Sequence, residues 1–453
     1  IFEWCMPNPS FSQQDFQEQL NQPDNYAFIQ SLKQYSTADL ADILMGLPIN
    51  DQIRLLEQLP QASYVFEFLA LTEQQQLAAQ LPQALLVKLL AHMHSDDRTD
   101  LFQSLAQDVQ GHIFPQLDAH VQAQLKTLMD YPAESAGAIM STEVITVHAE
   151  MTIQQAIQHI RQHAAESETL YLIYVTDALR YLHGVISLRQ IIQSPPEQLI
   201  GQVMTSHVIT GLVSEDQESI AQKLAHYDFM ALPIVDEQQR LLGIVTYDDA
   251  MDVVQQETTE DILKSSAVAA SPQMSIKTAP ILLLYQKRVF WLVFLVFGSL
   301  LSGLGIAHFE DLIAAHIVLV FFLPLLVGSG GNAGSQSATL MVRALATGDV
   351  HFKDWFYLLG RESLVALCLG GTMATAVSIL GYFRGDILVA VVLALSMMGI
   401  VLMGCLIGMS LPFILNRMKL DPASASAPLV TSICDASGVV VYLLIASQIL
   451  TLS

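Results

Sequence analysis

The carboxyl-terminal third of the chain is nearly free of charge, and this feature constrains the fold more than any other. Five stretches lack Asp, Glu, Lys and Arg: residues 289–309, 312–342, 363–383, 387–416 and 422–453, the last broken only by Asp435. A bilayer core requires about 20 apolar residues per helix. Soluble helices carry a polar face, which these stretches lack. We therefore expect five transmembrane helices rather than a buried soluble bundle.

The rest of the chain is strongly acidic. Residues 1–286 hold 35 acidic and 12 basic side chains and so carry the whole net charge of −23, whereas residues 287–453 hold eight of each. This balance excludes a basic nucleic-acid-binding protein. The four cysteines show no Cys-x-x-Cys spacing, so neither a disulfide framework nor a zinc site is predicted. No secretory signal is visible, and we expect the acidic half to stay in the cytoplasm.

Basic residues gather on one side of the expected helices. Cytoplasmic loops of membrane proteins carry an excess of Lys and Arg. Seven basic residues precede the first helix or fall in connections on that side, against Arg384 alone on the other. The acidic half is therefore expected inside and the carboxyl terminus outside. The seven are Lys287, Arg288, Arg343, Lys353, Arg361, Arg417 and Lys419.

The second apolar stretch contains Pro324 and then the segment GSGGNAGSQSAT at residues 328–339. Glycines and small polar residues at membrane depth are tolerated where backbone faces protein or a water-filled cavity. They also allow close helix packing. We favour a polar pathway or a bent helix lining one, with tight packing as the alternative.

Asp435 is the sharpest functional signal in the apolar region. An acid inside a membrane is costly, so it usually faces a cavity and marks an ion or substrate route. No Lys or Arg lies in the same stretch, and Thr431 is one helical turn earlier. An unpaired buried carboxylate favours a positive partner. A cation site is predicted here, with a carboxylate bonded to helix termini as the structural alternative.

Residues 26–131 consist of short apolar runs separated by Leu-Pro steps. The dipeptide recurs at residues 47–48, 59–60 and 81–82. Proline ends one helix and favours the start of the next. We therefore predict a small α-helical superhelix of imperfect repeats. His92 and His94 are two residues apart, which does not place them on one helical face, and we interpret both as solvated.

Residues 137–256 contain an internal duplication. MSTEVIT at residues 140–146 matches MTSHVIT at 204–210, an offset of 64, and HGVISLRQII at 183–192 matches LGIVTYDDAM at 242–251, an offset of 59. Each copy is predicted as strand, helix, strand, strand, helix. The pair resembles tandem CBS modules, which are regulatory α/β units.

The CBS resemblance implies an adenine-nucleotide site only in part. In that family a Gly-apolar-apolar-Thr/Ser-x-x-Asp turn often contacts ribose and phosphates, and the second copy keeps Thr246 and Asp249 in this turn. The first copy has Gln190 where Asp is expected, and Leu172 replaces an aromatic residue. Binding of ATP or another adenine nucleotide is left open. The candidate residues are Arg189, Phe229 and Thr246.

An acidic stretch follows directly after the second copy. No Lys or Arg falls between Arg240 and Lys264, and acids spaced four apart destabilise an isolated helix. A solvated charged face is the usual explanation of any one of these acids. Hard divalent cations with oxygen ligands would relieve the repulsion of the whole set. Its members are Asp248, Asp249, Asp252, Glu257, Glu260 and Asp261.

The order of helical domain, CBS pair and five spans resembles the MgtE family of magnesium channels over nearly the whole chain. The motifs that carry the resemblance lie at residues 227–249, 328–349 and 421–438. It implies a homodimer in the bacterial inner membrane, with Asp435 facing a pore on the two-fold axis and holding hydrated Mg²⁺. The pore-lining positions would be Gly328, Gly331, Asn332, Gln336, Thr431 and Ala427, although some relatives have Asn at position 427.

The same resemblance implies that the cytosolic part senses Mg²⁺ and closes the pore when the ion is abundant. The partners are then the lipid bilayer, a second copy of the chain and Mg²⁺, with no nucleic acid. The positions that match sensor ligands are Asp96, Asp100, Asp228, Asp249, Asp252, Glu257, Glu260, Asp261 and Asp421.

The expected fold is multidomain: an α-helical amino-terminal domain, α/β tandem CBS modules and an all-α membrane domain. The alternative function is a CBS-regulated secondary transporter of another divalent cation or solute, although five spans do not divide into equal repeats. No nucleophile–base pair or cofactor motif predicts an enzyme. The expected boundaries are 1–25 tail, 26–131 helical domain, 132–199 and 200–256 CBS modules, 257–286 connecting helix and 287–453 pore domain.

Overall fold

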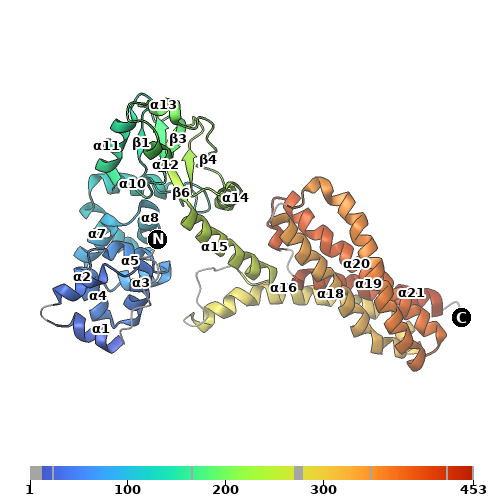
Figure 1. Ribbon diagram of the computed structural model, residues 1–453. Coiled ribbons are helices and arrows are strands. Elements are labelled where there is room, and N and C mark those ends of the chain that lie inside the picture. The colour runs from blue at the N-terminus through green and yellow to red at the C-terminus, as the bar shows by residue number, and fades with distance from the viewer. Residues whose placement is uncertain are drawn as a thin grey trace. The chain divides into compact units, whose positions relative to one another are not determined.

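The computed structural model describes residues 13–22, 25–164, 167–269, 279–346, 349–424 and 427–450 (Figure 1). The chain divides into two compact units, residues 1–255 and residues 256–453. Most of the expected tail, residues 1–12 and 23–24, lies outside the described part.

The first half of unit 1 is a stack of short helices around a single leucine-rich core. The predicted helical domain is confirmed, and its Leu-Pro steps fall between helices: Pro48 and Pro82 are the residues immediately before α4 and α7. Proline suits this position because the N–H groups at the start of a helix have no partner within the helix, so the N–H that proline lacks is not needed. The helices are α1 (Gln13–Leu20), α2 (Tyr26–Leu32), α3 (Thr37–Gly46), α4 (Ile49–Gln58), α5 (Ala62–Glu67), α6 (Leu71–Ala78), α7 (Gln83–His92), α8 (Ser95–Ser104), α9 (Gln107–Ile113), η1 (Phe114–Gln116) and α10 (Ala119–Met129).

The second half of unit 1 contains two copies of one α/β module, which confirms the CBS prediction. In each copy the first strand pairs parallel with the second, and the second pairs antiparallel with the third. The first copy comprises β1 (Thr146–Val147), α11 (Ile153–His163), β2 (Leu172–Thr176), β3 (Leu182–Ser187) and α12 (Leu188–Gln193); after α13 (Ile200–Val203) the second comprises β4 (Gly211–Leu212), α14 (Gln217–Tyr227), β5 (Ala231–Val235), β6 (Leu241–Thr246) and α15 (Tyr247–Ser265).

The segment before each module pairs with the last strand of the other module. Ser141 forms a bridge with Ile244, and Thr205 forms the matching bridge with Val185. The two bridges are related by the offsets of 64 and 59 found in the sequence. A Cβ at Gly243 would lie 2.4 Å from the carbonyl oxygen of Ser141, so this close approach requires glycine. The duplication therefore produces one interlocked pair.

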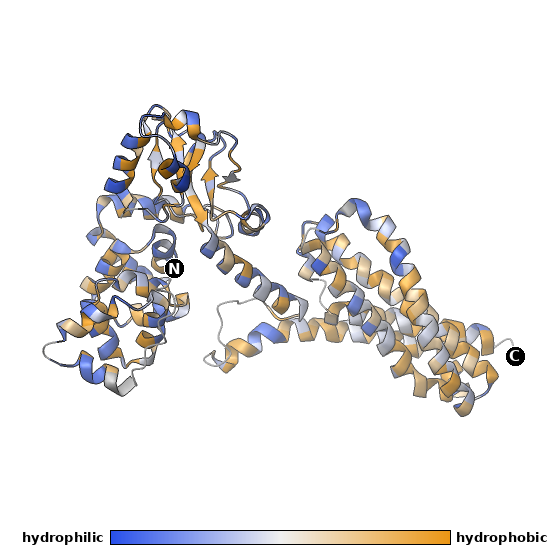
Figure 2. Cartoon of the chain, in the orientation of Figure 1, coloured by the Kyte–Doolittle hydropathy of each residue, from blue (hydrophilic) through white to orange (hydrophobic). Residues whose placement is uncertain are grey.

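The described residues of unit 2 form five helices long and apolar enough to cross a membrane, in agreement with the five predicted spans. Figure 2 shows these helices mostly in orange, the colour of hydrophobic residues. These helices are α16 (Ile281–His308), α18 (Val318–Ala346), α19 (Trp355–Arg384), α20 (Ile387–Arg417) and α21 (Ala427–Leu450), with α17 (Glu310–Ala315), η3 (Phe352–Asp354) and η4 (Pro422–Ser424) between them.

The stretch expected as a connecting helix, residues 257–286, contains the end of α15 and the start of α16. Helix α15 begins at Tyr247, inside the second module, and ends at Ser265. Residues 270–278 lie outside the described part of the chain.

The glycines of α18 serve helix packing, which is the alternative that the sequence left open. A Cβ at Gly404 of α20 would lie 2.4 Å from the carbonyl oxygen of Gly330, and one at Gly408 would lie 2.0 Å from that of Gly334. Both distances are far below van der Waals contact. The small-xxx-small spacing therefore brings the backbones of α18 and α20 together. Pro324 lies within α18, which continues through it as one helix.

We predict that Gly408→Ala destabilises unit 2. The added methyl group has no space against Gly334, and overpacking of this kind costs about 1–3 kcal/mol. Thermal unfolding of the purified chain in detergent would show a lower midpoint. Gly303→Ala is the matched control, because a Cβ at Gly303 meets no atom within 4 Å among the described residues. Equal midpoints for the two variants would contradict the packing role.

Candidate cation sites

Asp435 lies on α21 at its contact with the glycine-rich part of α18. Its Oδ1 is buried and has no hydrogen-bond partner among the described residues. A Cβ at Gly331 would lie 3.2 Å from this oxygen, so the glycine leaves the carboxylate room. The arrangement is an unneutralised acid inside an apolar helical unit, which is expensive unless a cation occupies the site.

A pair of hydroxyl groups lies one helical turn from this acid. Ser335 Oγ is 3.0 Å from Thr431 Oγ1 and 3.3 Å from the carbonyl oxygen of Ala427, to which it donates. The structure thus brings Asp435, Thr431, Ala427 and Gly331 to one contact between α18 and α21. Sequence reasoning missed Ser335, although its four-residue spacing from Gly331 placed it on the same face of the helix.

The two amides predicted to line a pore face outward from α18. Asn332 and Gln336 are exposed and four residues apart, and Gly328 continues the same face one turn earlier. Within unit 2 alone they do not join the contact around Asp435. Exposed amides on a membrane-spanning helix are unfavourable against lipid and suit a protein or water-filled surface instead.

Glu362 is a second acid within a spanning helix that sequence reasoning missed. It lies in α19, just before the charge-free stretch, and accepts a hydrogen bond from the buried Ser337 hydroxyl of α18. Its carboxylate therefore holds α19 to α18, whereas Asp435 lacks such a donor. The helix begins at Trp355, earlier than the charge count indicated, and this places Glu362 inside it.

Lys264 connects two of the predicted sensor acids in unit 2. Its Nζ lies 2.6 Å from Glu260 Oε1 and 2.5 Å from Asp421 Oδ2, which ties α15 to the segment between α20 and α21. Burial opposes the charged form, but the hydrogen bonds to Asp421 and Glu260 raise the pKa of Lys264 above its ordinary value. An ammonium group thus occupies a position where these carboxylates could share a metal cation.

Asp261 and Glu257 lie on the same helix as this ion pair. Burial raises the pKa of the Asp261 carboxyl, and the negative charge of Asp421 raises it further. Four of the nine predicted sensor residues therefore belong to unit 2: Glu257, Glu260, Asp261 and Asp421.

Three predicted sensor acids influence one another in unit 1. Asp96, at the start of α8, is 9% exposed, and burial followed by the charge of Asp249 raises its pKa. Burial and Asp249 also raise the pKa of Asp100 to about 6. The structure therefore brings Asp96 and Asp100 of the helical domain to Asp249 of the second CBS module, although about 150 residues separate them in sequence.

The other two predicted sensor acids are more peripheral. Asp252 is exposed on α15. Partial burial of its carboxyl, and then the negative charge of Asp248, raise its pKa. Asp228 is the exposed residue that ends α14, with a φ of 53°. Its carboxylate forms no hydrogen bond or ion pair with the other acids in the described part of the chain.

The two nucleotide turns keep the same helix cap despite the departure at Gln190. Asp249 accepts hydrogen bonds from the hydroxyl and N–H groups of Thr246. At the equivalent position Gln190 accepts from the hydroxyl of Ser187 at 2.9 Å and from its N–H at 2.8 Å. Phe229 is stacked on the ring of Tyr227, with centroids 5.4 Å apart. Arg189 is exposed.

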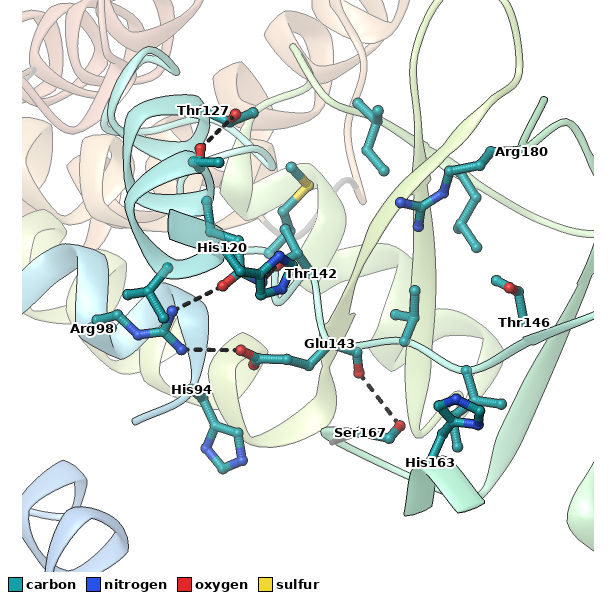
Figure 3. A pocket seen from close by; sticks show the side chains of 18 of the residues that line it. His94, Arg98, His120, Thr127, Thr142, Glu143, Thr146, His163, Ser167 and Arg180 are labelled. Carbon is teal, nitrogen blue, oxygen red and sulfur yellow. Dashed lines mark hydrogen bonds and ion pairs between the residues drawn. The ribbon is translucent and has the colours of Figure 1, made fainter. Parts of the chain in front are cut away.

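A cleft of about 1240 Å³ lies between the helical domain and the CBS pair within unit 1. Figure 3 shows Arg98 and Glu143 joined across one side of it, with Nη2 and Oε1 3.1 Å apart, and Arg180 reaching in from the opposite side. None of Arg189, Phe229 and Thr246 lines this cleft. The residues predicted to bind a nucleotide therefore lie outside this cleft.

His94 is not the solvated residue that the sequence indicated. Its Nδ1 lies 3.2 Å from Glu67 Oε2 and its Nε2 lies 3.5 Å from Glu168 Oε2. Burial lowers the pKa of the imidazole, but the hydrogen bond to Glu67 and the charge of Glu168 prevail and raise it to about 9. The spacing of His92 and His94 could not indicate the environment of His94, because its partners Glu67 and Glu168 come from other parts of the chain.

The fold and these sites define a membrane protein with a five-helix membrane unit and an acidic unit that contains a CBS pair. Residues 323–445 match the family described as a divalent cation transporter, MgtE; residues 35–134 match the MgtE intracellular N domain; residues 136–197 and 200–256 match the CBS domain. The chain is 35% identical to the magnesium transporter MgtE of Thermus thermophilus, over 96% of this chain and 97% of the relative. The chain belongs to the MgtE family.

Two further comparisons agree. The magnesium transporter MgtE of Bacillus subtilis is 32% identical over 78% of both chains. A crystal structure of the cytosolic domain of the Mg²⁺ channel MgtE in complex with ATP matches 53% of this chain and all of its own, with a TM-score of 0.50 and 32% identity.

We predict that, without divalent cations, α8 is less protected from amide exchange as the pH rises. Asp97, Asp100 and Glu168 have folded-state pKa values of about 8, 6 and 7, raised chiefly by burial. Between about pH 4 and these values the folded chain binds more protons than the unfolded one, so stability falls with rising pH. His94 acts in the same direction between 6.5 and about 9.

The measurement is hydrogen–deuterium exchange with chelator present, corrected for the intrinsic pH dependence of exchange. Asp97→Asn should flatten the decline, because the amide does not ionise. Asp108→Asn, at an exposed acid of the same domain, should leave the decline unchanged. Protection of α8 that is independent of pH would contradict the prediction.

Proposed function

We propose that the chain is a homodimeric Mg²⁺ channel whose pore is lined by α18 and α21 and contains Asp435. The observation that carries the proposal is the buried, unpartnered Asp435 oxygen beside Gly331. Three relatives that match between 72% and 96% of the chain are named magnesium transporters. The proposed orientation places residues 1–286 in the cytoplasm and the carboxyl terminus outside, as the basic loops indicate.

The chemistry of Mg²⁺ suits a site with few protein ligands. This ion dehydrates reluctantly and usually keeps several waters while one or two carboxylates hold it. One Asp435 from each subunit would supply two negative charges to a hydrated ion. The Ser335 and Thr431 hydroxyl oxygens, one turn away, could accept hydrogen bonds from the waters of this ion.

A second copy of the chain would explain the outward polar face of α18. Asn332 and Gln336 are exposed within one chain, and a pore between two copies would place these amides against water rather than lipid. Helix α16 packs against α21 but buries no residue completely, so much of its apolar surface is open to lipid or to the other subunit. Both features support a dimer.

Gating by cytosolic Mg²⁺ is the second part of the proposal. The acids of unit 1 around Asp249 repel one another and have raised pKa values, so a divalent cation would stabilise the arrangement that brings them together. In unit 2, Mg²⁺ would compete with Lys264 for Glu260 and Asp421. Shifting the ratio of closed to open channels from 1:99 to 99:1 requires the cation to bind the closed state more favourably by about 5.5 kcal/mol. Several sites can share this difference.

Adenine-nucleotide binding is proposed for the second CBS module only. Thr246 and Asp249 keep the turn, and Phe229 supplies an aromatic face nearby in sequence. The similar cytosolic domain that was crystallised with ATP supports nucleotide binding in general, and the turn of Thr246 and Asp249 favours the second module.

We predict that Asp435→Asn abolishes Mg²⁺ flux. The amide has the same shape but lacks the charge that attracts the hydrated ion, and we expect at least a tenfold loss. Mg²⁺ uptake into proteoliposomes down a concentration gradient provides the measurement. Asp386→Asn is the matched control: Asp386 caps α20 through Oδ1, and asparagine accepts the same bonds. Undiminished flux in Asp435→Asn would exclude this pore assignment.

We predict that replacing four sensor acids by their amides leaves the pore open at millimolar Mg²⁺. The closed arrangement then lacks the negative charges that make it bind the cation more tightly than the open arrangement does. Flux is measured in proteoliposomes with and without internal Mg²⁺. The replaced acids are Asp249, Asp252, Glu257 and Glu260.

The control for this variant removes four negative charges from exposed positions that the proposal does not use. It should still close at the same Mg²⁺ concentration. Closure of the sensor variant at the concentration that closes the parent chain would show that its acids are only solvated charge. The control acids are Glu57, Asp108, Glu197 and Glu237.

A further inference from the structure

One cluster in unit 1 contains a histidine as well as carboxylates. Glu67 ends α5, His94 immediately precedes α8, and Asp97 lies in the first turn of α8. Each offers one ligand atom, and the three atoms all lie within 4.8 Å of one another. Glu67 and His94 are 27 residues apart in sequence, so only the fold of the helical domain brings them together.

Glu67 is held in place by the backbone of the residue that it faces. The N–H of His94 donates to Glu67 Oε1 at 2.6 Å, which fixes one oxygen of the carboxylate. The other oxygen, Oε2, lies 3.2 Å from His94 Nδ1. Side chains oriented in this way lose little conformational freedom when they bind a ligand.

The other ring nitrogen of His94 faces a carboxylate from a different domain. His94 Nε2 lies 3.5 Å from Oε2 of Glu168, which also accepts a hydrogen bond from Ser141 at 3.2 Å. Histidines that bind metal ions almost always direct their second N–H at a carboxylate or carbonyl group. Glu168 is therefore placed to orient the ring so that Nδ1 points at Glu67.

The remaining ligand, Asp97, lies among acids that lack neutralising partners. Its carboxylate accepts no hydrogen bond from any residue that the structure describes. The neighbouring Asp96 is 9% exposed, and its buried Oδ1 is also without a partner in the described part of the chain. Buried polar atoms are normally satisfied, so the Asp96 oxygen points to a positive charge bound close to Asp97.

We propose that Glu67, His94 and Asp97 form a site for a borderline first-row divalent cation such as Zn²⁺, Co²⁺ or Ni²⁺. Imidazole nitrogen suits these ions, whereas Mg²⁺ prefers oxygen ligands alone. Tetrahedral bonds of about 2.1 Å place ligand atoms about 3.4 Å apart, close to the 3.2 Å between Glu67 and His94. The site goes beyond the proposed Mg²⁺ sensor, because its ligand set and its preferred ions differ.

Such an ion would also strengthen one contact between domains. All three ligands belong to the helical domain, while Glu168 belongs to the first CBS module. Metal binding increases the positive charge on the His94 ring, which strengthens its hydrogen bond to Glu168. The site therefore links the availability of a transition metal to the packing of α8 against the CBS pair.

The test is a Co²⁺ titration of the full purified chain in detergent, in the presence of excess Mg²⁺. Co²⁺ bound by a nitrogen and two carboxylates gives visible absorption bands that differ from those of the hydrated ion. We expect one equivalent that Mg²⁺ does not displace and that Zn²⁺ does. His94→Gln and Asp97→Asn should abolish it, and Glu168→Gln should weaken binding about 10- to 100-fold.

His92→Gln is the matched control, because His92 is exposed and its Nδ1 is 2.9 Å from the carbonyl oxygen of Lys88. This variant should bind Co²⁺ as the parent chain does. Exchange protection of α8 under chelator confirms that each variant is folded. Identical titrations for the parent chain and folded His94→Gln, or complete displacement by Mg²⁺, would overturn the proposal. Neither outcome depends on whether the chain transports Mg²⁺.

Discussion

Carboxylates held away from water without enough cations determine the chemistry of both units. In the membrane unit the carboxylate is Asp435, whose Oδ1 has no partner among the described residues. In unit 1 it is the group around Asp96 and Asp249, where burial and mutual repulsion raise the pKa values. The free energy lost at each place is recovered when a cation binds. The cations that we propose at these places would therefore stabilise the fold as well as serve the proposed activity.

The contrast between Asp435 and Glu362 shows how one residue type serves two purposes. Both are acids in spanning helices with a side chain near α18, but Ser337 donates to Glu362, whereas Gly331 lies beside Asp435. A glycine offers neither a donor nor bulk. The glycine-rich segment thus packs α18 against α20 on one side and leaves an acid open on another. Tight packing therefore explains the face toward α20, whereas the polar pathway stays a prediction for the face toward Asp435.

Sequence patterns predicted the features that depend on local periodicity. The five spans followed from runs without charge, the helical domain from Leu-Pro steps, and the CBS pair from its duplication. Contacts such as Lys264 with Asp421, or His94 with Glu67, join residues 157 and 27 positions apart, and no spacing rule reveals them. The ion pair of Lys264 with Glu260 could have been predicted from the sequence, because the two residues lie four positions apart in a predicted helix.

The departure at Gln190 follows from the same electrostatic argument. Gln190 and Asp249 occupy equivalent positions, and each caps its helix by accepting from the preceding Ser or Thr. Glutamine therefore preserves the local structure of the first module while removing its charge. Asp249 alone keeps a carboxylate, and this is the one that Asp96 and Asp100 face. Of the two turns, only that of the second module has a carboxylate for the cation site that we propose with the helical domain. This proposal would give the asymmetry of the duplication a physical reason beyond the weakening of a nucleotide turn.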